Sequence, residues 1–296
     1  MLSRLRGALS FSGYLINTLL WTPLVMLLGL VKLLPFAPLQ HGCTVLIDTI
    51  ATWWISINNA NQRLFSRTKM ITHSLPQLSA QQWYLVVANH QSWVDILMLQ
   101  HLFNRKIPFL KFFLKWELIY VPFLGLAWWA LDFPFMRRYS KSFLKKHPHL
   151  KGKDQETTRK ACAKFHNKPV SVMNFVEGTR FTIDKQQRQK SPYKQLLKPK
   201  VGGVALSLDA MDGKLNTLLD VTIYYPGGIP SFWDFLCGRV DRVELHVEQH
   251  CLEAVNQLNY QDRDGKTAYQ SWLNQIWHHK AGKLAQLGSL HRKTDT

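Results

Sequence analysis

The segment NHQSWVD, residues 89–95, places a histidine and an aspartate five positions apart. An aspartate that accepts a hydrogen bond from one ring nitrogen of a histidine fixes its tautomer, so the second nitrogen can take a proton from an alcohol. His90 and Asp95 are therefore candidates for general-base catalysis without a serine or cysteine nucleophile. A second interpretation is structural, with His90 as a hydrogen-bonded core residue and Asp95 as a helix cap. The pair alone supports both interpretations.

The local structure decides whether the two side chains can meet. Five steps of about 100° along one regular helix would turn them about 140° apart, so a single helix cannot bring them together. Ser92 lies three residues before Asp95, which predicts a capping box that opens a helix over 93–103. His90 would then lie in the loop after an expected strand over 83–88, at the strand end where α/β folds place their sites. No G-x-S-x-G elbow surrounds Ser92, so a cap explains this serine better than a nucleophile does.

A second candidate site is the segment FVEGTRFT, residues 175–182, which ends another apolar run. Gly178 permits a tight turn that lets backbone amides approach an anion, and Arg180 supplies a guanidinium that can bind a phosphate in a bidentate manner. A solvent-facing arginine after an acidic-glycine turn is the more common event. The motif alone therefore leaves both interpretations open.

The pattern of the chain beyond residue 69 alternates between strand and helix. Short apolar runs predict strands at 83–88, 133–136, 170–176, 218–225 and 242–248. Helical patterns predict helices over 93–103, 153–166 and 265–287. This alternation predicts an α/β fold with a mostly parallel central sheet flanked by helices.

The chain begins with an apolar segment, and none of the 25 residues from Gly7 to Val31 is charged. At about 1.5 Å per residue such a helix spans a hydrocarbon core of roughly 30 Å, and it lacks the features of a cleaved signal peptide. The next segment, 44–57, has apolar residues and paired tryptophans at helical spacing, which favours an interfacial helix over a buried core helix. We expect a membrane-embedded helical anchor over 1–66 and a catalytic domain over 67–296. A hairpin would keep both flanks of the anchor on the cytoplasmic side.

The formal net charge of +18 is concentrated in the middle of the chain, where residues 105–200 hold 22 Lys and Arg against 6 Asp and Glu. Such a field attracts nucleic acid, anionic lipid, or phosphorylated and acidic substrates. Aromatic residues cluster with aliphatic ones, as in AWWAL, and do not alternate with basic residues, which argues against a nucleic-acid partner. The four cysteines are widely spaced and form no C-x-x-C pair, so neither a metal site nor a disulfide framework is indicated.

Four segments in order resemble the conserved blocks of the glycerolipid acyltransferase family. They are the His90-x-x-x-x-Asp95 pair, KWELIYVPFLG (115–125) running on to FMRR (135–138), FVEGTR (175–180) and LLKPKVGGVAL (196–206). The family includes bacterial 1-acylglycerol-3-phosphate acyltransferases of the PlsC type, and the wording around the second and third blocks resembles its YihG-like bacterial branch. Val176 stands where the family usually has a proline, a change that removes no chemical group.

The resemblance implies a membrane-bound O-acyltransferase of the cell inner membrane, with its catalytic domain facing the cytoplasm. It would transfer a fatty acyl group from acyl-CoA or acyl carrier protein to the sn-2 hydroxyl of lysophosphatidic acid, giving phosphatidic acid. An acyltransferase or transacylase acting on another lysophospholipid is the alternative. Membrane lipids, the lysophospholipid acceptor and the acyl donor would be the partners, and no cofactor and no metal would be needed.

The same resemblance assigns residues to roles. His90 would be the general base and Asp95 its orienting partner. The acceptor phosphate would be bound by Arg137, Arg138, Glu177, Gly178, Thr179 and Arg180. The substrate channel would be shaped by Lys115, Pro122 and Pro199. The apolar stretch 118–131 is then either a core helix or a wall of an acyl-chain tunnel, and these two interpretations are compatible.

Overall fold

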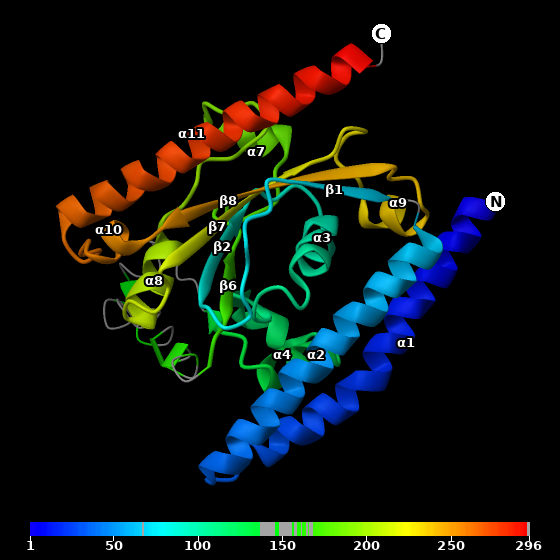
Figure 1. Ribbon diagram of the computed structural model, residues 1–296, viewed down its shortest axis with the longest axis vertical. Coiled ribbons are helices and arrows are strands. Elements are labelled where there is room, and N and C mark those ends of the chain that lie inside the picture. Colours follow the sequence, from blue (N-terminus) through cyan, green and yellow to red (C-terminus); the bar gives the residue numbers. More distant parts are fainter. Residues whose placement is uncertain are drawn as a thin grey trace.

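The computed structural model describes residues 1–66, 68–136, 146–147, 156, 159–160, 162–163, 165 and 168–294. Two long N-terminal helices lie beside an α/β domain whose central sheet is covered by helices on both faces (Figure 1). Most of the helix expected over 153–166 falls outside the described residues, as do Arg137 and Arg138.

The central sheet has six strands in the order β1-β8-β7-β2-β6-β3. All neighbours pair in parallel except β7 and β8, so the expected mostly parallel sheet is confirmed. The strands are β1 (Lys69–His73), β2 (Tyr84–Ala88), β3 (Leu110–Phe112), β6 (Ser171–Asn174), β7 (Thr217–Tyr224) and β8 (Arg242–Cys251).

One predicted strand is not part of this sheet. Within the expected strand 133–136, only β5 (Phe135–Met136) is extended, and it pairs with β4 (Leu114–Lys115) in a separate two-stranded sheet. Its apolar sequence reflects burial beside the N-terminal helices, since Phe133 belongs to the hydrophobic cluster that they share with the α/β domain. The predicted strand is therefore present over two of its four residues, and it lies outside the central sheet.

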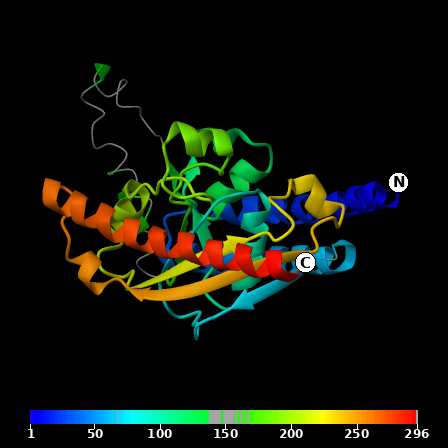
Figure 2. The same cartoon turned by 90° about the horizontal axis from the view of Figure 1, so that it is seen from above.

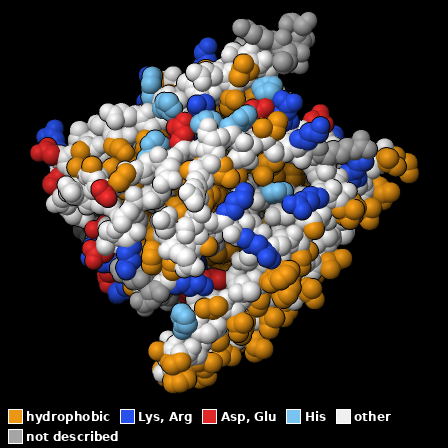
Figure 3. Space-filling model, in the orientation of Figure 1, with side chains coloured by type: hydrophobic (Ala, Val, Ile, Leu, Met, Phe, Trp, Pro, Cys, Tyr) orange, Lys and Arg blue, Asp and Glu red, His pale blue; other side chains and the backbone are white. Residues whose placement is uncertain are grey.

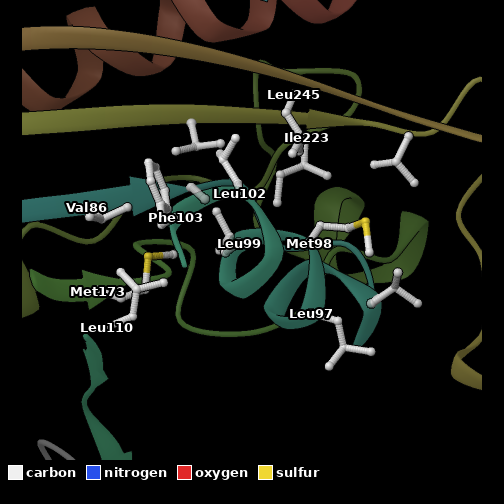
Figure 4. Packing of buried hydrophobic residues seen from close by; sticks show 14 of the residues in the cluster. Val86, Leu97, Met98, Leu99, Leu102, Phe103, Leu110, Met173, Ile223 and Leu245 are labelled. Carbon is white, nitrogen blue, oxygen red and sulfur yellow. The ribbon is translucent and has the colours of Figure 1, made fainter. Parts of the chain in front are cut away.

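Helices cover both faces of the sheet. Helix α3 (Val94–Phe103) lies on one face and packs with strand residues such as Val86 and Met173, as Figure 4 shows. Helices α8 (Gly202–Met211) and α11 (Arg263–Thr294) lie on the other, and α11 runs obliquely across β7 and β8 (Figures 1 and 2). All five residues of β2 are buried, as expected for a central strand covered on both sides. This strand delivers the chain to the loop that holds His90.

The remaining described elements are short. They are the 3-10 helix η1 (Trp116–Tyr120) and the α-helices α4 (Leu124–Ala130), α7 (Ile183–Arg188), α9 (Phe232–Leu236) and α10 (Glu253–Asn256).

The N-terminal helices α1 (Leu2–Val31) and α2 (Ala37–Phe65) form an antiparallel hairpin. Among the described residues, α1 is the one helix long and apolar enough to cross a membrane. Polar contacts join the two helices: the Asn17 amide donates to Asn58 Oδ1 at 2.8 Å, and the Trp54 indole N–H donates to Thr18 Oγ1 at 3.2 Å. The hairpin is therefore held in one register by specific hydrogen bonds as well as by apolar packing.

The hairpin is also attached to the α/β domain. Lys32, after α1, forms an ion pair with Asp132, and Asp48 of α2 contacts Lys111 at 3.4 Å and Lys168 at 2.7 Å. Gly29 of α1 lies so close to Ala130 of α4 that a Cβ at this position would be 2.6 Å from the alanine methyl group. The hairpin and the domain thus share one packed interface.

Helix α2 is longer than the expected 44–57 segment and has two different sides. Ile47, Ile50 and Ile55 are buried, whereas Leu46 and Trp53 are exposed. The core-helix interpretation therefore describes one side of α2, and an interfacial position of the exposed side stays a prediction. Figure 3 shows that exposed apolar side chains form a continuous ridge along the hairpin.

Candidate catalytic site

His90, in the loop between β2 and α3, meets Asp95 in the first turn of α3. His90 Nδ1 lies 2.9 Å from Asp95 Oδ2, and Asp95 is fully buried, while 13% of the His90 side chain is exposed. The loop after the strand folds the histidine back toward the first turn of α3, which a single helix could not do. Because Nδ1 faces the carboxylate, Nε2 is the ring nitrogen left to meet a substrate.

The start of α3 differs from the predicted capping box. The Asp95 carboxylate accepts from the backbone N–H of Ser92 at 2.9 Å, as predicted, but the Ser92 hydroxyl accepts from Val94 N at 3.2 Å instead of from Asp95 N. The carboxylate also accepts from Gln91 N at 2.6 Å. Trp93, and not Ser92, is the N-cap residue. Asp95 is thus both a helix cap and the partner of His90, so the two interpretations from the sequence are compatible.

Three contacts fix His90 itself. Its backbone N–H donates to Glu177 Oε1 at 2.8 Å, and its carbonyl oxygen accepts from Phe181 N at 2.7 Å. The imidazole stacks on Phe175, with ring centroids 3.9 Å apart and an interplanar angle of 15°. Three residues of the segment 175–182 therefore contact His90. The sequence of the segment alone did not indicate these contacts.

Glu177 faces the interior of the protein. Its side chain is fully buried, and its second oxygen, Oε2, accepts from Leu197 N at 2.7 Å. Burial raises the pKa of Glu177 to about 7, against the opposing effect of the hydrogen bonds from the N–H groups of His90 and Leu197. The carboxylate therefore joins two loops through backbone amides and is not directed at a surface anion.

The rest of the Glu-Gly-Thr-Arg turn lies nearer the surface. Gly178 has a φ of 71°, a conformation that favours glycine, and its N–H donates to Phe175 O at 2.8 Å to close the turn. Thr179 Oγ1 accepts from Lys185 Nζ at 2.9 Å. Arg180 is exposed and its guanidinium lies 4.7 Å from the ring centroid of Trp93. The turn thus presents cationic groups close to the loop that carries His90.

An apolar cavity of about 360 Å³ begins at His90, in the candidate catalytic loop of residues 89–93, and extends between the hairpin and the α/β domain. His90 and Phe175 lie at one part of its wall. The lining includes Trp21, Val25, Ile50, Ala51, Trp54, Leu97, Phe112, Leu114, Leu124, Ala127, Trp128 and Phe133, from both N-terminal helices and from the α/β domain. The candidate base, His90, therefore lies in the wall of an apolar cavity.

The three predicted channel residues do not line this cavity. Lys115 follows Leu114, and Pro122 is two residues before Leu124; Leu114 and Leu124 both line the cavity. Pro199 lies on another loop, where its carbonyl accepts from Gln270 Nε2 at 3.2 Å. Within 118–131, Leu124, Ala127, Trp128 and Leu131 line the cavity, while Ala130 and Leu131 belong to the cluster shared with the hairpin. This segment is both a core element and a cavity wall.

Two contributors to the site had no signal in the sequence. Tyr225 donates its hydroxyl hydrogen to Asp95 Oδ1 at 2.5 Å, although 130 residues separate them. Asn89 pairs with the backbone of Ile223, donating to its oxygen at 2.9 Å and accepting from its nitrogen at 2.8 Å. Tyr225 and Asn89 each follow a strand, and their positions in the sequence do not predict either contact.

One group of potential metal ligands is present among the described residues, away from the catalytic loop. Ligand atoms of Asp220, Glu248 and His250 lie within 4.8 Å of one another, on β7 and β8. Lys280 Nζ is 2.8 Å from Asp220 Oδ1, and Lys283 Nζ is 3.7 Å from Glu248 Oε1. The two ammonium groups would repel a divalent cation, so this group does not favour a metal. The absence of a metal requirement stays a prediction.

Known proteins are similar to this chain in sequence and in fold. Residues 69–225, just over half of the chain, match the family described as Acyltransferase. The chain is 27% identical over 221 residues to "Probable 1-acyl-sn-glycerol-3-phosphate acyltransferase 5" of Arabidopsis thaliana, covering 70% of this chain and 54% of that protein. It is 25% identical over 132 residues to "2-acyl-1-lysophosphatidylinositol acyltransferase" of Saccharomyces cerevisiae, covering 38% and 31%. The chain thus spans about half the length of the first relative.

A solved structure covers nearly the whole chain. The crystal structure of the 1-acyl-sn-glycerophosphate (LPA) acyltransferase PlsC from Thermotoga maritima aligns with 95% of this chain and 98% of its own, with a TM-score of 0.50 and 18% sequence identity. This similarity concerns the fold, including the N-terminal helices, and confirms the predicted fold class.

Proposed function

The chain belongs to the Acyltransferase family, and we propose that it transfers a fatty acyl group from a thioester donor to the sn-2 hydroxyl of lysophosphatidic acid, giving phosphatidic acid. The observation that carries the proposal is the buried His90–Asp95 pair at the wall of an apolar cavity, next to a turn that bears Arg180. The name of the Arabidopsis relative supports the choice of acceptor. The YihG-like branch within the family stays a prediction.

The proposed reaction needs one base and no acyl-enzyme. His90 Nε2 takes the proton of the attacking hydroxyl as its oxygen bonds to the thioester carbonyl carbon, and Asp95 stabilises the imidazolium that forms. When the tetrahedral intermediate collapses, the carbon–sulfur bond breaks, and the imidazolium returns its proton to the departing thiolate. The stacking of His90 on Phe175 and its two backbone bonds hold the ring in one orientation for both transfers.

The donor is acyl-CoA or acyl-acyl carrier protein, and no other cofactor is proposed. The apolar cavity would hold the fatty acyl chain, since its wall is formed by aliphatic and aromatic side chains. The cations that follow Arg180, such as Lys185 and Arg188 of α7, would attract the phosphates of coenzyme A or an acidic carrier protein.

We place the enzyme at the cell inner membrane, with its catalytic domain on the cytoplasmic side. The turn between α1 and α2 supports attachment to a membrane, because Leu33, Leu34 and Phe36 are exposed there and suit lipid better than water. The two helices run antiparallel, so a hairpin embedded tip first would keep the domain at one membrane face. Membrane lipids then surround the hairpin and also supply the acceptor.

The direct test supplies the full-length protein, in membranes, with labelled lysophosphatidate and oleoyl-coenzyme A. Time-dependent phosphatidate formation above that of control membranes supports the proposal. Release of free fatty acid without phosphatidate would identify a hydrolase and contradict it. The match to a lysophosphatidylinositol acyltransferase favours one alternative acceptor, so lysophosphatidylinositol and other lysophospholipids are supplied in parallel.

Arg180→Ala should weaken acceptor binding. A charge-assisted hydrogen bond contributes about 1.5–3 kcal/mol, so the KM for lysophosphatidate is expected to rise by about 10–100-fold with little change in kcat. Steady-state kinetics with the acceptor varied at saturating donor measures this. Arg263→Ala, which removes an exposed arginine at the start of α11, is the matched control. An unchanged KM for the acceptor would show that Arg180 does not bind its phosphate.

Ala127→Trp should shorten the acyl chain that the enzyme accepts. Ala127 lines the cavity, so an indole at this position would fill part of the space near α4. We expect the rate with oleoyl donor to fall at least about tenfold relative to the rate with octanoyl donor. Leu126→Trp adds the same group to the exposed side of the same helix and should leave the ratio unchanged. Equal ratios in all three proteins would place the acyl chain elsewhere.

A further inference from the structure

The Asp95 carboxylate accepts hydrogen bonds at both oxygens. Oδ2 accepts from His90 Nδ1 and from the backbone N–H groups of Gln91 and Ser92, all within the same loop. Oδ1 accepts from the hydroxyl of Tyr225 at 2.5 Å. The tyrosine is therefore the contact that comes from a distant part of the chain and acts on the oxygen turned away from the histidine.

Tyr225 is fixed independently of this bond. It directly follows β7, and only 4% of it is exposed. Two residues before it, the backbone of Ile223 is held by the side chain of Asn89. Five residues after it, the oxygen of Pro230 accepts from the Ser92 hydroxyl at 2.7 Å. These contacts join the end of β7 to the catalytic loop on both sides of Tyr225, so the backbone sets the position of its hydroxyl.

The hydroxyl acts as a permanent donor. Burial raises the pKa of Tyr225 well above its ordinary value, and the negative charge of Asp95 acts in the same direction. The phenol therefore keeps its proton throughout the range in which histidines titrate. A hydrogen bond to a charged acceptor in a buried setting is stronger than one between neutral groups.

We propose that Tyr225 is a positioning residue that sets how strongly the His90–Asp95 pair binds a proton. Its bond to Oδ1 holds the carboxylate so that Oδ2 faces the imidazole. It also draws negative charge away from the carboxylate, so Asp95 stabilises the protonated imidazole less than an aspartate without this donor would. The inference rests on the proposed function, in which His90 must be unprotonated to act as a base.

Tyr225→Phe tests the inference, because it removes only the O–H group. Without this donor the imidazolium is held more tightly, so the acid limb of the pH profile of kcat/KM should move up by about 0.5–1 pH unit. Glu177, which accepts from the His90 backbone N–H, is present in both proteins, so the difference between their profiles reports the loss of the Tyr225 hydroxyl. The KM for each substrate should stay within about twofold, since the hydroxyl contacts Asp95 and not the substrate. Tyr224→Phe is the matched control, because Tyr224 lies on the other side of the strand and stacks on His291 at 5.7 Å.

A second replacement reverses the expected direction. 3-Fluorotyrosine at position 225 keeps the hydroxyl but makes it a stronger donor, so the acid limb should move to lower pH. An acid limb that stays in place in both variants, or a change confined to KM, would overturn the inference. If Tyr225→Phe does not fold, as judged by thermal melting, the fluorotyrosine variant decides the question alone, because it retains the bond.

Failure of the proposed function is distinguishable from failure of this inference. If the wild type acylates no lysophospholipid, the proposed function is wrong. The titration of the His90 ring, followed by NMR in the wild type and in Tyr225→Phe, then tests the coupling directly. A higher titration midpoint in the variant supports the inference, and an equal midpoint overturns it.

Discussion

Replacing His90 by alanine is expected to lower the rate of phosphatidate formation by about 10²–10⁴-fold, the usual contribution of a positioned general base. The loss should appear in kcat, because the imidazole acts on the proton that moves in the transition state. Asp95→Asn should show a smaller loss, since an amide cannot stabilise the imidazolium and can turn its NH₂ group toward Nδ1. Initial rates are measured with labelled lysophosphatidate and oleoyl-coenzyme A at equal protein abundance.

The control for this prediction removes a histidine elsewhere. His41→Ala changes an exposed residue of α2, and its rate should equal that of the wild type. Thermal melting in detergent shows whether His90→Ala remains folded. An active His90→Ala protein would mean that another group takes the proton, and the catalytic interpretation of the pair would be abandoned.

Glu177→Ala is expected to reduce both stability and turnover. The carboxylate accepts from the backbone N–H groups of His90 and Leu197, and its removal leaves two buried donors without an acceptor. Each unsatisfied group costs about 1–3 kcal/mol, so the free energy of unfolding should fall by about 2–6 kcal/mol. Turnover should fall as well, because the loop that orients His90 loses one of its supports.

Glu177→Gln separates charge from hydrogen bonding. An amide keeps one acceptor oxygen but sets a donor against the second backbone N–H, so its stability and turnover should lie between those of the wild type and Glu177→Ala. A phosphate-binding role for Glu177 would instead raise the KM for the acceptor and leave the melting temperature unchanged. Melting curves and kinetics of both variants decide between these outcomes.

The same carboxyl predicts a dependence of stability on pH. Burial raises the pKa of Glu177 from 4.5 to about 7. Because the folded state binds the proton more tightly than the unfolded state, the stabilisation is fully present below about pH 4.5 and is lost as the pH rises through about 7. The free energy of unfolding of the wild type, relative to that of Glu177→Gln, should therefore decrease over this interval. A constant difference would contradict the raised pKa.

The sequence was sufficient for the parts of the site that lie close together along the chain. The apolar run 83–88 predicted a strand, and Ser92 with Asp95 predicted the start of a helix. The loop between them brings the side chains of His90 and Asp95 together. Tyr225 could not be found in this way, because the contact depends on which strands are neighbours in the sheet. The order of the strands in the sheet cannot be predicted from local sequence patterns.

Two further side chains were not placed by sequence patterns. The resemblance assigned Glu177 to phosphate binding with its neighbours in the turn, and the structure directs its side chain inward to two backbone amides. Strand β3 was missed because Lys111 interrupts its apolar pattern. That lysine is nevertheless buried, and its ammonium group donates to Leu131 O at 2.7 Å and pairs with Asp48. Glutamate and lysine usually indicate exposed positions. Glu177 and Lys111 are nevertheless both buried, because their hydrogen-bond partners come from distant parts of the chain.

The N-terminal hairpin also forms part of the cavity wall, through Trp21, Val25, Ile50 and Trp54. The predicted boundary at residue 67 divides the chain into hairpin and domain, but the walls of the cavity come from both parts. If this cavity holds the acyl chain, as we propose, a protein cut at that boundary would lose part of its acyl-chain pocket together with its proposed membrane attachment. Substitutions on the cavity-lining side of the hairpin should then change acyl-chain selectivity.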